Sequence, residues 1–142
     1  MARFNERLIA DNVQVIRRGL ARMRQMASGS REAFLASDDN YAIVEHHLRR
    51  SLEALFDLGR HIVVKAGMGN PGTYSEVLAL LRDGNVISGE FYERIQGMAG
   101  YRNRLVHEYH RVTPDELWQI ISEDLEDIEM LLGHLLKFVR SA

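Results

Sequence analysis

The chain of 142 residues contains no cysteine, so neither disulfide bonds nor thiolate metal sites are available to it. No apolar run approaches the roughly 20 residues that a membrane-spanning helix needs. Residues 1–12 alternate charged and apolar side chains and therefore lack the apolar core of a signal peptide. These absences predict a soluble, cytoplasmic protein with no membrane contact, and the length predicts a single domain over residues 1–142.

An excess of positive charge is also missing, because the net charge is −2, which argues against a constitutive, non-specific nucleic-acid binder. The charge is unevenly distributed along the chain. Residues 1–111 hold 16 basic and 13 acidic side chains, whereas residues 112–142 hold 2 basic and 7 acidic ones. Sixteen of the 18 basic residues are arginine, whose forked guanidinium suits contacts with phosphate. We therefore expect any RNA-facing side to lie away from the acidic C-terminal helix.

Apolar residues recur every three or four positions, which predicts helices, and no strand-like alternation competes with this pattern. Helices are expected over about residues 3–27, 40–66, 73–83, 88–106 and 113–140. Asp38 and Asp39 are expected to cap the second helix, Ser88 the fourth and Thr113 the fifth. Between the first two helices, residues 31–37 are expected to form a connector with at most one helical turn. We predict an all-α fold, an antiparallel bundle of four to five helices.

Residues 101–111 contain an unusual density of groups that transfer protons or bind phosphate. Arg102 falls on the apolar stripe that runs through residues 91–109, and a charged residue on such a face is unfavourable unless it is paired. Arg102 and His107 are five residues apart, which separates them by about 140° around a straight helix. Two solutions would bring them together: the helix ends before His107, or a second copy of the chain completes the site.

The spacing Arg-x4-His-x-Tyr, formed by Arg102, His107 and Tyr109, resembles the signature of the HEPN superfamily. It is most similar to the HepT-like toxins of HepT/MntA toxin–antitoxin pairs. Asn103 also fits, since members of this family often carry a polar residue directly after the arginine. The setting agrees with the resemblance, because the motif lies near the end of a late helix in a short helical chain.

This resemblance implies a metal-independent RNA endonuclease toxin that needs no cofactor and builds its active site between the chains of a homodimer or higher oligomer. His107 would act as acid and base, Arg102 would stabilise the phosphate, and Asn103 and Tyr109 would support them. Tyr109 would also accept AMP from a cognate MntA-like nucleotidyltransferase antitoxin, which silences the toxin. The alternative function is a catalytically silent helical module that docks to the nucleotidyltransferase.

The same residues also have a purely structural interpretation. Arg102 and His107 can cap the carbonyl groups at a helix end and complement the helix dipole. His110 and Arg111 are left undecided between structure and function. His107 and His110 are one residue short of the spacing in zinc proteases, and no other cluster of histidines or carboxylates predicts a metal site.

Two outward-facing sets of polar residues are interpreted as solvated helix faces. The first set is the arginines of the first helix: Arg7, Arg17, Arg18, Arg22 and Arg24. The second set belongs to the second helix and contains one carboxylate and three imidazoles: Asp57, His46, His47 and His61. We leave open whether Asp57 contributes to the site.

Overall fold

The structure is a computed structural model that describes residues 4–107 and 112–142. The described residues contain helices and no strand, so the predicted all-α fold is confirmed. In chain order the helices are α1 (Glu6–Ala27), α2 (Arg31–Leu35), α3 (Asp38–Lys65), α4 (Tyr74–Asp83), α5 (Gly89–Ile95), α6 (Gly97–His107), α7 (Pro114–Glu123) and α8 (Leu125–Ser141). None of these helices is long and apolar enough to cross a membrane.

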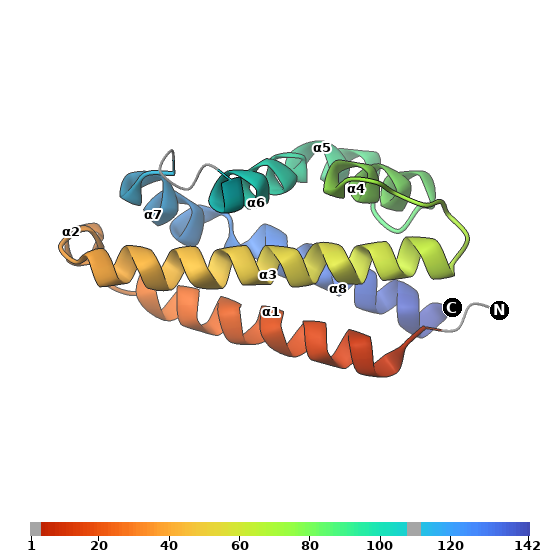
Figure 1. Ribbon diagram of the computed structural model, residues 1–142, viewed down its shortest axis with the longest axis horizontal. Coiled ribbons are helices and arrows are strands. Elements are labelled where there is room, and N and C mark those ends of the chain that lie inside the picture. Colours follow the sequence, from red (N-terminus) through yellow and green to blue (C-terminus); the bar gives the residue numbers. More distant parts are fainter. Residues whose placement is uncertain (1–3, 108–111) are drawn as a thin grey trace.

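The long helix α3 is the centre of the bundle, because it contacts α1, α4, α6, α7 and α8 (Figure 1). Helix α1 lies along one side of α3, while α4, α5 and α6 lie on the opposite side. One face of α3 is buried along its whole length and contains eight residues: Val44, Leu48, Leu52, Leu55, Phe56, Gly59, Ile62 and Val63. Burial of these residues against apolar side chains of several other helices supplies most of the stabilisation of the bundle.

Polar residues begin the helices, though not always the residues that we expected. The hydroxyl groups of Ser88 and Thr113 accept hydrogen bonds from backbone N–H groups in the first turns of α5 and α7, which confirms both predicted caps. The prediction for α3 was wrong by one residue. Ser37 is its cap, accepting from the backbone N–H of Asp39, whereas Asp38 and Asp39 lie in the first turn. In the first turn, their negative charges interact favourably with the positive end of the helix dipole and stabilise the helix.

The fourth and fifth predicted helices are each interrupted, so the prediction of two continuous helices was wrong. Helix α5 ends before Gln96 and α6 begins at Gly97, where two glycines in four residues, Gly97 and Gly100, weaken the helix. Helices α7 and α8 meet at Asp124, whose side chain is half-buried and whose backbone angles are −110° and −5°. Asp124 falls on the apolar stripe of this segment, and a carboxylate there cannot pack as a leucine would.

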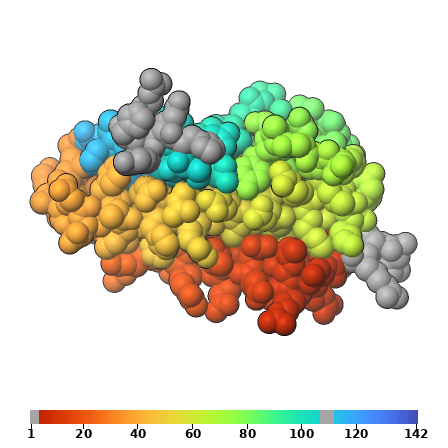
Figure 2. Space-filling view, viewed as in Figure 1, coloured from red at the N-terminus to blue at the C-terminus, as the bar shows by residue number. Residues whose placement is uncertain are grey.

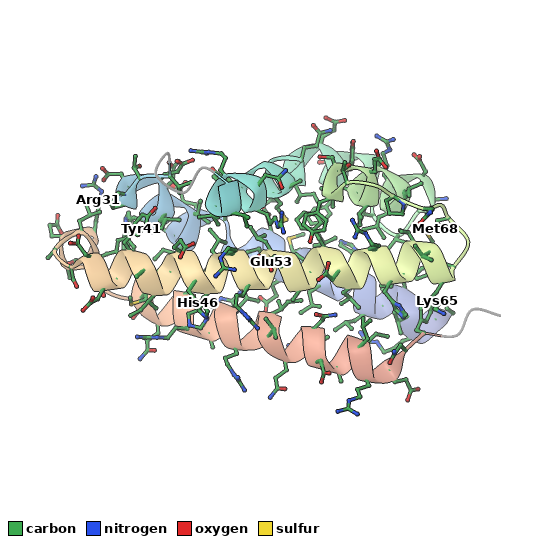
Figure 3. All side chains as sticks on the ribbon, viewed as in Figure 1. Arg31, Tyr41, His46, Glu53, Lys65 and Met68 are labelled. Atoms are coloured by element: carbon green, nitrogen blue, oxygen red, sulfur yellow. The ribbon has the colours of Figure 1, made fainter. Side chains whose placement is uncertain are left out.

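Two contacts fasten the ends of the bundle to α3. The Tyr41 hydroxyl donates a hydrogen bond to the Val112 carbonyl at 2.6 Å, which holds the start of the α7 segment (Figure 3). At the other end, Nε2 of His61 accepts a hydrogen bond from the backbone N–H of Asn5 at 2.9 Å. Burial lowers the pKa of His61, so the neutral, accepting form is favoured. The interpretation of His61 as a solvated residue was therefore wrong, whereas His46 is exposed as expected.

Helices α1 and α3 approach closely at Gly19, which predicts a measurable effect of a single methyl group. A Cβ atom at Gly19 would overlap Oγ of Ser51, a fully buried serine. We expect Gly19→Ala to lower the free energy of unfolding by about 1–3 kcal/mol in urea titrations. The Gly19→Ala/Ser51→Ala double variant should recover most of this loss, because the obstructing oxygen is gone.

The control for this substitution is Gly133, an exposed glycine inside α8 with no atom near its missing Cβ. Gly133→Ala should raise the free energy of unfolding by up to about 1 kcal/mol, since alanine favours the helix. A Gly19→Ala chain as stable as the original would contradict the close approach of α1 and α3.

Candidate functional site

Helix α6 carries the part of the predicted motif that the structure describes, from Arg102 to His107. The helix spans Gly97–His107, so the first of the two expected solutions, a helix that ends before His107, is not what the structure has. Arg102 and His107 are separated by about 140° around one helix axis. The side chain of His107 and all of Tyr109 lie outside the described residues, as do His110 and Arg111.

The side chain of Arg102 is half-buried and rests on an aromatic ring. Its guanidinium carbon lies 4.9 Å from the centroid of the Tyr74 ring, a distance that gives a cation–π interaction. Its Nη1 group donates a long hydrogen bond of 3.4 Å to Oδ1 of Asn103, the next residue of the motif. Its Nε atom is buried and has no hydrogen-bond partner among the described residues. Arg102 is thus held by an aromatic partner within its own chain.

Tyr74 is the first residue of α4 and is fixed on two sides. Its ring stacks on Phe56 of α3, with the centroids 4.7 Å apart and the planes within 10°. Its hydroxyl donates a hydrogen bond of 3.3 Å to Oδ1 of Asp57. Burial raises the pKa of Tyr74, and the nearby charge of Asp57 raises it further, so the hydroxyl stays protonated as a donor. A rigid ring of this kind can hold a guanidinium in one orientation.

A second arginine approaches the same ring. The guanidinium carbon of Arg60, on α3, lies 5.5 Å from the Tyr74 centroid, and its Nε atom is also buried without a partner among the described residues. Sequence reasoning missed Arg60 and Tyr74, and treated Asp57 as solvated. Asp57 is exposed, but it is also the acceptor for Tyr74. The only available signal was that Asp57 and Arg60 are three apart and share a face of α3.

These side chains surround an open hollow of about 310 Å³ between α4 and α6. Figure 2 shows α4 and α6 beside one another above α3. The lining is polar and carries two cations: Arg60, Gly72, Thr73, Tyr74, Arg102 and Asn103. Guanidinium, amide and hydroxyl groups around one space are the groups that bind phosphate in proteins.

Six described arginines have a carboxylate partner within 4 Å, and four of them pair with the acidic C-terminal segment. The bidentate pair of Arg104 with Glu116, at 2.6 and 2.8 Å, joins α6 to α7. Three further ion pairs join helices in the same way: Arg24 with Glu129, Arg31 with Asp115 and Arg94 with Asp127. By contrast, no carboxylate of a described residue lies within 4 Å of the guanidinium nitrogens of Arg60 or Arg102. The acidic segment therefore pairs with four arginines that join helices and forms no ion pair with Arg60 or Arg102.

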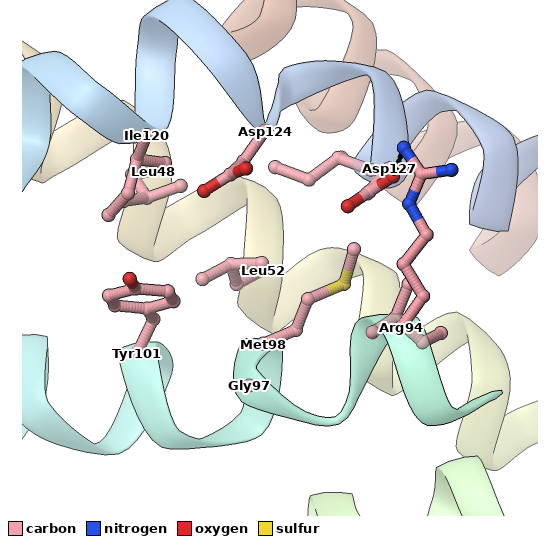
Figure 4. A pocket seen from close by; sticks show the side chains of 11 residues that line it. Leu48, Leu52, Arg94, Gly97, Met98, Tyr101, Ile120, Asp124 and Asp127 are labelled. Carbon is pink, nitrogen blue, oxygen red and sulfur yellow. Dashed lines mark ion pairs between the residues drawn. The ribbon is translucent and has the colours of Figure 1, made fainter. Parts of the chain in front are cut away.

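A smaller hollow of about 110 Å³ lies where the α5–α6 break faces the α7–α8 break (Figure 4). Burial raises the pKa of Asp124, and the nearby charge of Asp127 adds to this effect. The guanidinium of Arg94 is already paired with Asp127 at 2.8 Å, and most of the lining is apolar. This hollow therefore lacks a cation to receive phosphate. The described residues contain no group of three or more His, Asp or Glu side chains arranged to hold a metal ion.

The bundle is similar to solved structures over almost its whole length. One is the tri-AMPylated Shewanella oneidensis HEPN toxin in complex with MNT antitoxin, with a TM-score of 0.81 and 25% identity over 92% of this chain and 97% of that one. The fold is also that of YutE from Bacillus subtilis, with a TM-score of 0.84 and 17% identity over 99% of this chain and 94% of that one. The fold is that of the HEPN class of proteins.

Within that class, the chain belongs to the family described as Ribonuclease HepT-like, whose model matches residues 16–135. It is similar to the tRNA nuclease HepT of Aphanizomenon flos-aquae, with 27% identity over 128 residues, 90% of this chain and 87% of that protein. It is similar to the same degree to the mRNA nuclease HepT of Shewanella oneidensis, with 27% identity over 128 residues, 88% of this chain and 93% of that protein. The family predicted from the Arg-x4-His-x-Tyr spacing is confirmed.

Proposed function

We propose that the chain is a metal-independent RNA endonuclease and the toxin of a toxin–antitoxin pair. The observation that carries this proposal is the environment of Arg102. It lies on the motif helix of a HepT-like protein and lines a hollow, with no carboxylate of a described residue within 4 Å. Its charge is therefore available to an anion. The two relatives named as tRNA and mRNA nucleases support RNA as the substrate class. Within that class we choose transfer RNA as the substrate. Sequencing the RNA ends that are left after expression of the chain tests this choice.

The proposed reaction uses the 2′-hydroxyl of RNA as its nucleophile. His107 takes the proton from this hydroxyl, the 2′-oxygen bonds to phosphorus, and the bond from phosphorus to the 5′-oxygen breaks. The protonated His107 gives a proton to the leaving 5′-oxygen, and the products are a 2′,3′-cyclic phosphate and a 5′-hydroxyl. Arg102 stabilises the charge that develops on the phosphate, with Asn103 and Tyr109 as supporting groups. DNA lacks the nucleophile and is not cut.

A second copy of the chain is proposed to complete the site. Because α6 includes His107, helix geometry separates Arg102 and His107 by about 140° around one axis. Two copies related by a twofold axis near α6 bring Arg102 and His107 of each chain to one groove. Two arginines in that groove repel one another, which favours binding of an anion between them. In sedimentation experiments we expect a homodimer at micromolar concentration, and a monomer that cleaves RNA at full rate would refute the shared site.

Regulation is proposed to act through Tyr109. A cognate MntA-like nucleotidyltransferase would attach AMP to its hydroxyl, placing phosphate groups near the motif arginine. The added charge and bulk would exclude an anionic substrate. The tri-AMPylated toxin in the similar Shewanella oneidensis complex supports this proposal. The alternative function, a silent module that docks to the nucleotidyltransferase, shares the partner but predicts no RNA cleavage.

Metal independence gives a direct test of the reaction. Purified protein should cleave RNA at an undiminished rate in excess EDTA and leave 2′,3′-cyclic phosphate ends, because the described chemistry needs only side chains and the 2′-hydroxyl. Gel electrophoresis before and after treatment with a cyclic-phosphate-specific phosphatase checks both points. A metal-dependent nuclease in the same buffer is the control, and it must lose its activity. Loss of cleavage in EDTA that a divalent cation restores would contradict the proposed mechanism.

A further inference from the structure

Arg60 has a position that the proposed reaction does not explain. It comes from α3 rather than from the motif helix, it is half-buried, and it lies 5.5 Å from the Tyr74 ring that also holds Arg102. Among the described residues its guanidinium forms no ion pair within 4 Å, unlike the arginines that join helices through Glu116 or Glu129. The two guanidinium groups repel one another, and the nearby Asp57 carboxylate, which acts on both through space, forms no ion pair within 4 Å with either, so the arrangement is stabilised when a further anion binds.

The ring between the two arginines is unsuited to stacking with a nucleobase. Phe56 covers one of its faces at 4.7 Å, and both guanidinium groups lie over the ring within 5.5 Å of its centroid. The remaining lining offers Thr73 and Asn103, which donate hydrogen bonds to phosphate oxygens as readily as to bases. The hollow therefore favours the backbone of a nucleic acid over its bases.

We propose that Arg60, with Tyr74 and Arg102, forms a phosphate-binding subsite for the RNA strand next to the cleaved bond. This inference rests on the proposed function, since it requires RNA as the ligand. Arg60 is a binding residue and does not touch the reacting atoms. Both guanidinium groups lie beside the same ring, so neighbouring phosphates of one strand can contact both. Because the subsite reads phosphate, its contribution is the same for every sequence.

Binding of an uncleavable probe tests the subsite separately from catalysis. The probes are two fluorescein-labelled 2′-O-methyl oligoribonucleotides, one of uridines and one of adenosines, in which the blocked 2′-oxygen prevents cleavage. Fluorescence anisotropy is measured on the full chain over a series of salt concentrations. We expect Arg60→Ala to weaken binding of both probes about tenfold, the effect of one charge-assisted hydrogen bond. The slope of log affinity against log salt should fall by about 0.7, as for one lost contact to a single strand.

Arg82 provides a matched control outside the hollow. It is also an arginine over a tyrosine, with its guanidinium carbon 4.2 Å from the Tyr92 ring, and it belongs to the neighbouring helix α4. Arg82→Ala changes the net charge by the same amount, so we expect its affinity to stay within about twofold of the original. If thermal unfolding shows that the Arg60→Ala chain is not folded, Arg60→Gln is used instead. Glutamine keeps most of the side-chain stem but removes the charge.

The outcomes of this experiment separate failure of the phosphate subsite from failure of the proposed nuclease function. Original affinity and salt slope in the Arg60 variant, or a loss confined to one probe, would overturn the phosphate subsite while leaving the proposed nuclease intact. An original chain that neither binds the probes nor cleaves RNA would overturn the proposed function itself. In cleavage assays the subsite further predicts that Arg60→Ala raises KM about tenfold with kcat little changed, whereas a structural role would not change the salt slope.

Discussion

Replacing Arg102 with alanine is expected to reduce RNA cleavage by at least about 100- to 1,000-fold, because the variant loses the group that stabilises the phosphate in the transition state. Expression of the original chain should arrest cell growth, and expression of Arg102→Ala should not. His107→Ala should be equally silent, since removal of a general acid–base group reduces rates by about 100- to 10,000-fold. Cleavage of a labelled RNA by the purified chains gives the rates, and thermal unfolding confirms that each variant is folded.

Two controls separate the role of Arg102 from its charge and from folding. Arg102→Lys keeps the positive charge but loses the planar fork that rests 4.9 Å from the Tyr74 ring, so it should remain strongly impaired. Arg82→Ala removes a charge that is paired with Asp83 away from the hollow, and it should remain fully toxic. Equal toxicity of the original chain and of both silent variants would contradict the nuclease. A folded original chain that causes no growth arrest would favour the docking module.

The same two silent variants test whether the site is shared between chains. Arg102→Ala and His107→Ala chains are unfolded together and refolded as a mixture. If each half-site of the shared groove takes Arg102 from one chain and His107 from the other, some dimers then contain one intact half-site. Cleavage should then return in the mixture but not in either variant refolded alone. A mixture that contains mixed dimers by native mass spectrometry, yet stays inactive, would show that each chain uses its own pair of residues.

Replacing Tyr109 with phenylalanine should make the toxin resistant to its antitoxin. Without the hydroxyl there is no acceptor for AMP, so co-expression of the cognate nucleotidyltransferase should rescue cells from the original chain but not from Tyr109→Phe. Nuclease activity itself should fall little, because the proposed role of Tyr109 in cleavage is only supporting. Intact-mass measurements should show added AMP on the original chain and none on the variant.

Tyr92→Phe is the control for this experiment, because it removes a hydroxyl from a half-buried tyrosine on α5, outside the motif helix. This variant should still gain AMP and still be neutralised. AMP addition to Tyr109→Phe, or its rescue by the nucleotidyltransferase, would place the modified residue elsewhere in the chain.

The sequence by itself determined the helices, most of their caps and the family. These features depend on neighbours within one or two turns: the 3.6-residue spacing of the α3 stripe, the hydroxyl groups of Ser88 and Thr113, and the five-residue step from Arg102 to His107. Local spacing is read directly from the order of residues. Local spacing gave no warning of the break at Asp124, because a carboxylate on an apolar stripe has two outcomes, a paired charge or an interrupted helix, and the tertiary contacts around it decide between them.

Only the tertiary structure decided what surrounds Arg102. Tyr74 is 28 positions away from it in the numbering and belongs to α4, yet its ring holds both Arg60 and Arg102. The acidic C-terminal segment looked like a separate negative face, but in the folded chain its carboxylates neutralise arginines of other helices, as Glu116 does for Arg104. Such pairings depend on the directions in which helices cross, and crossing is set by contacts along whole faces. The helix periodicity therefore placed Arg102 on an inward face, and the fold gave it a ring, a second arginine and an open hollow.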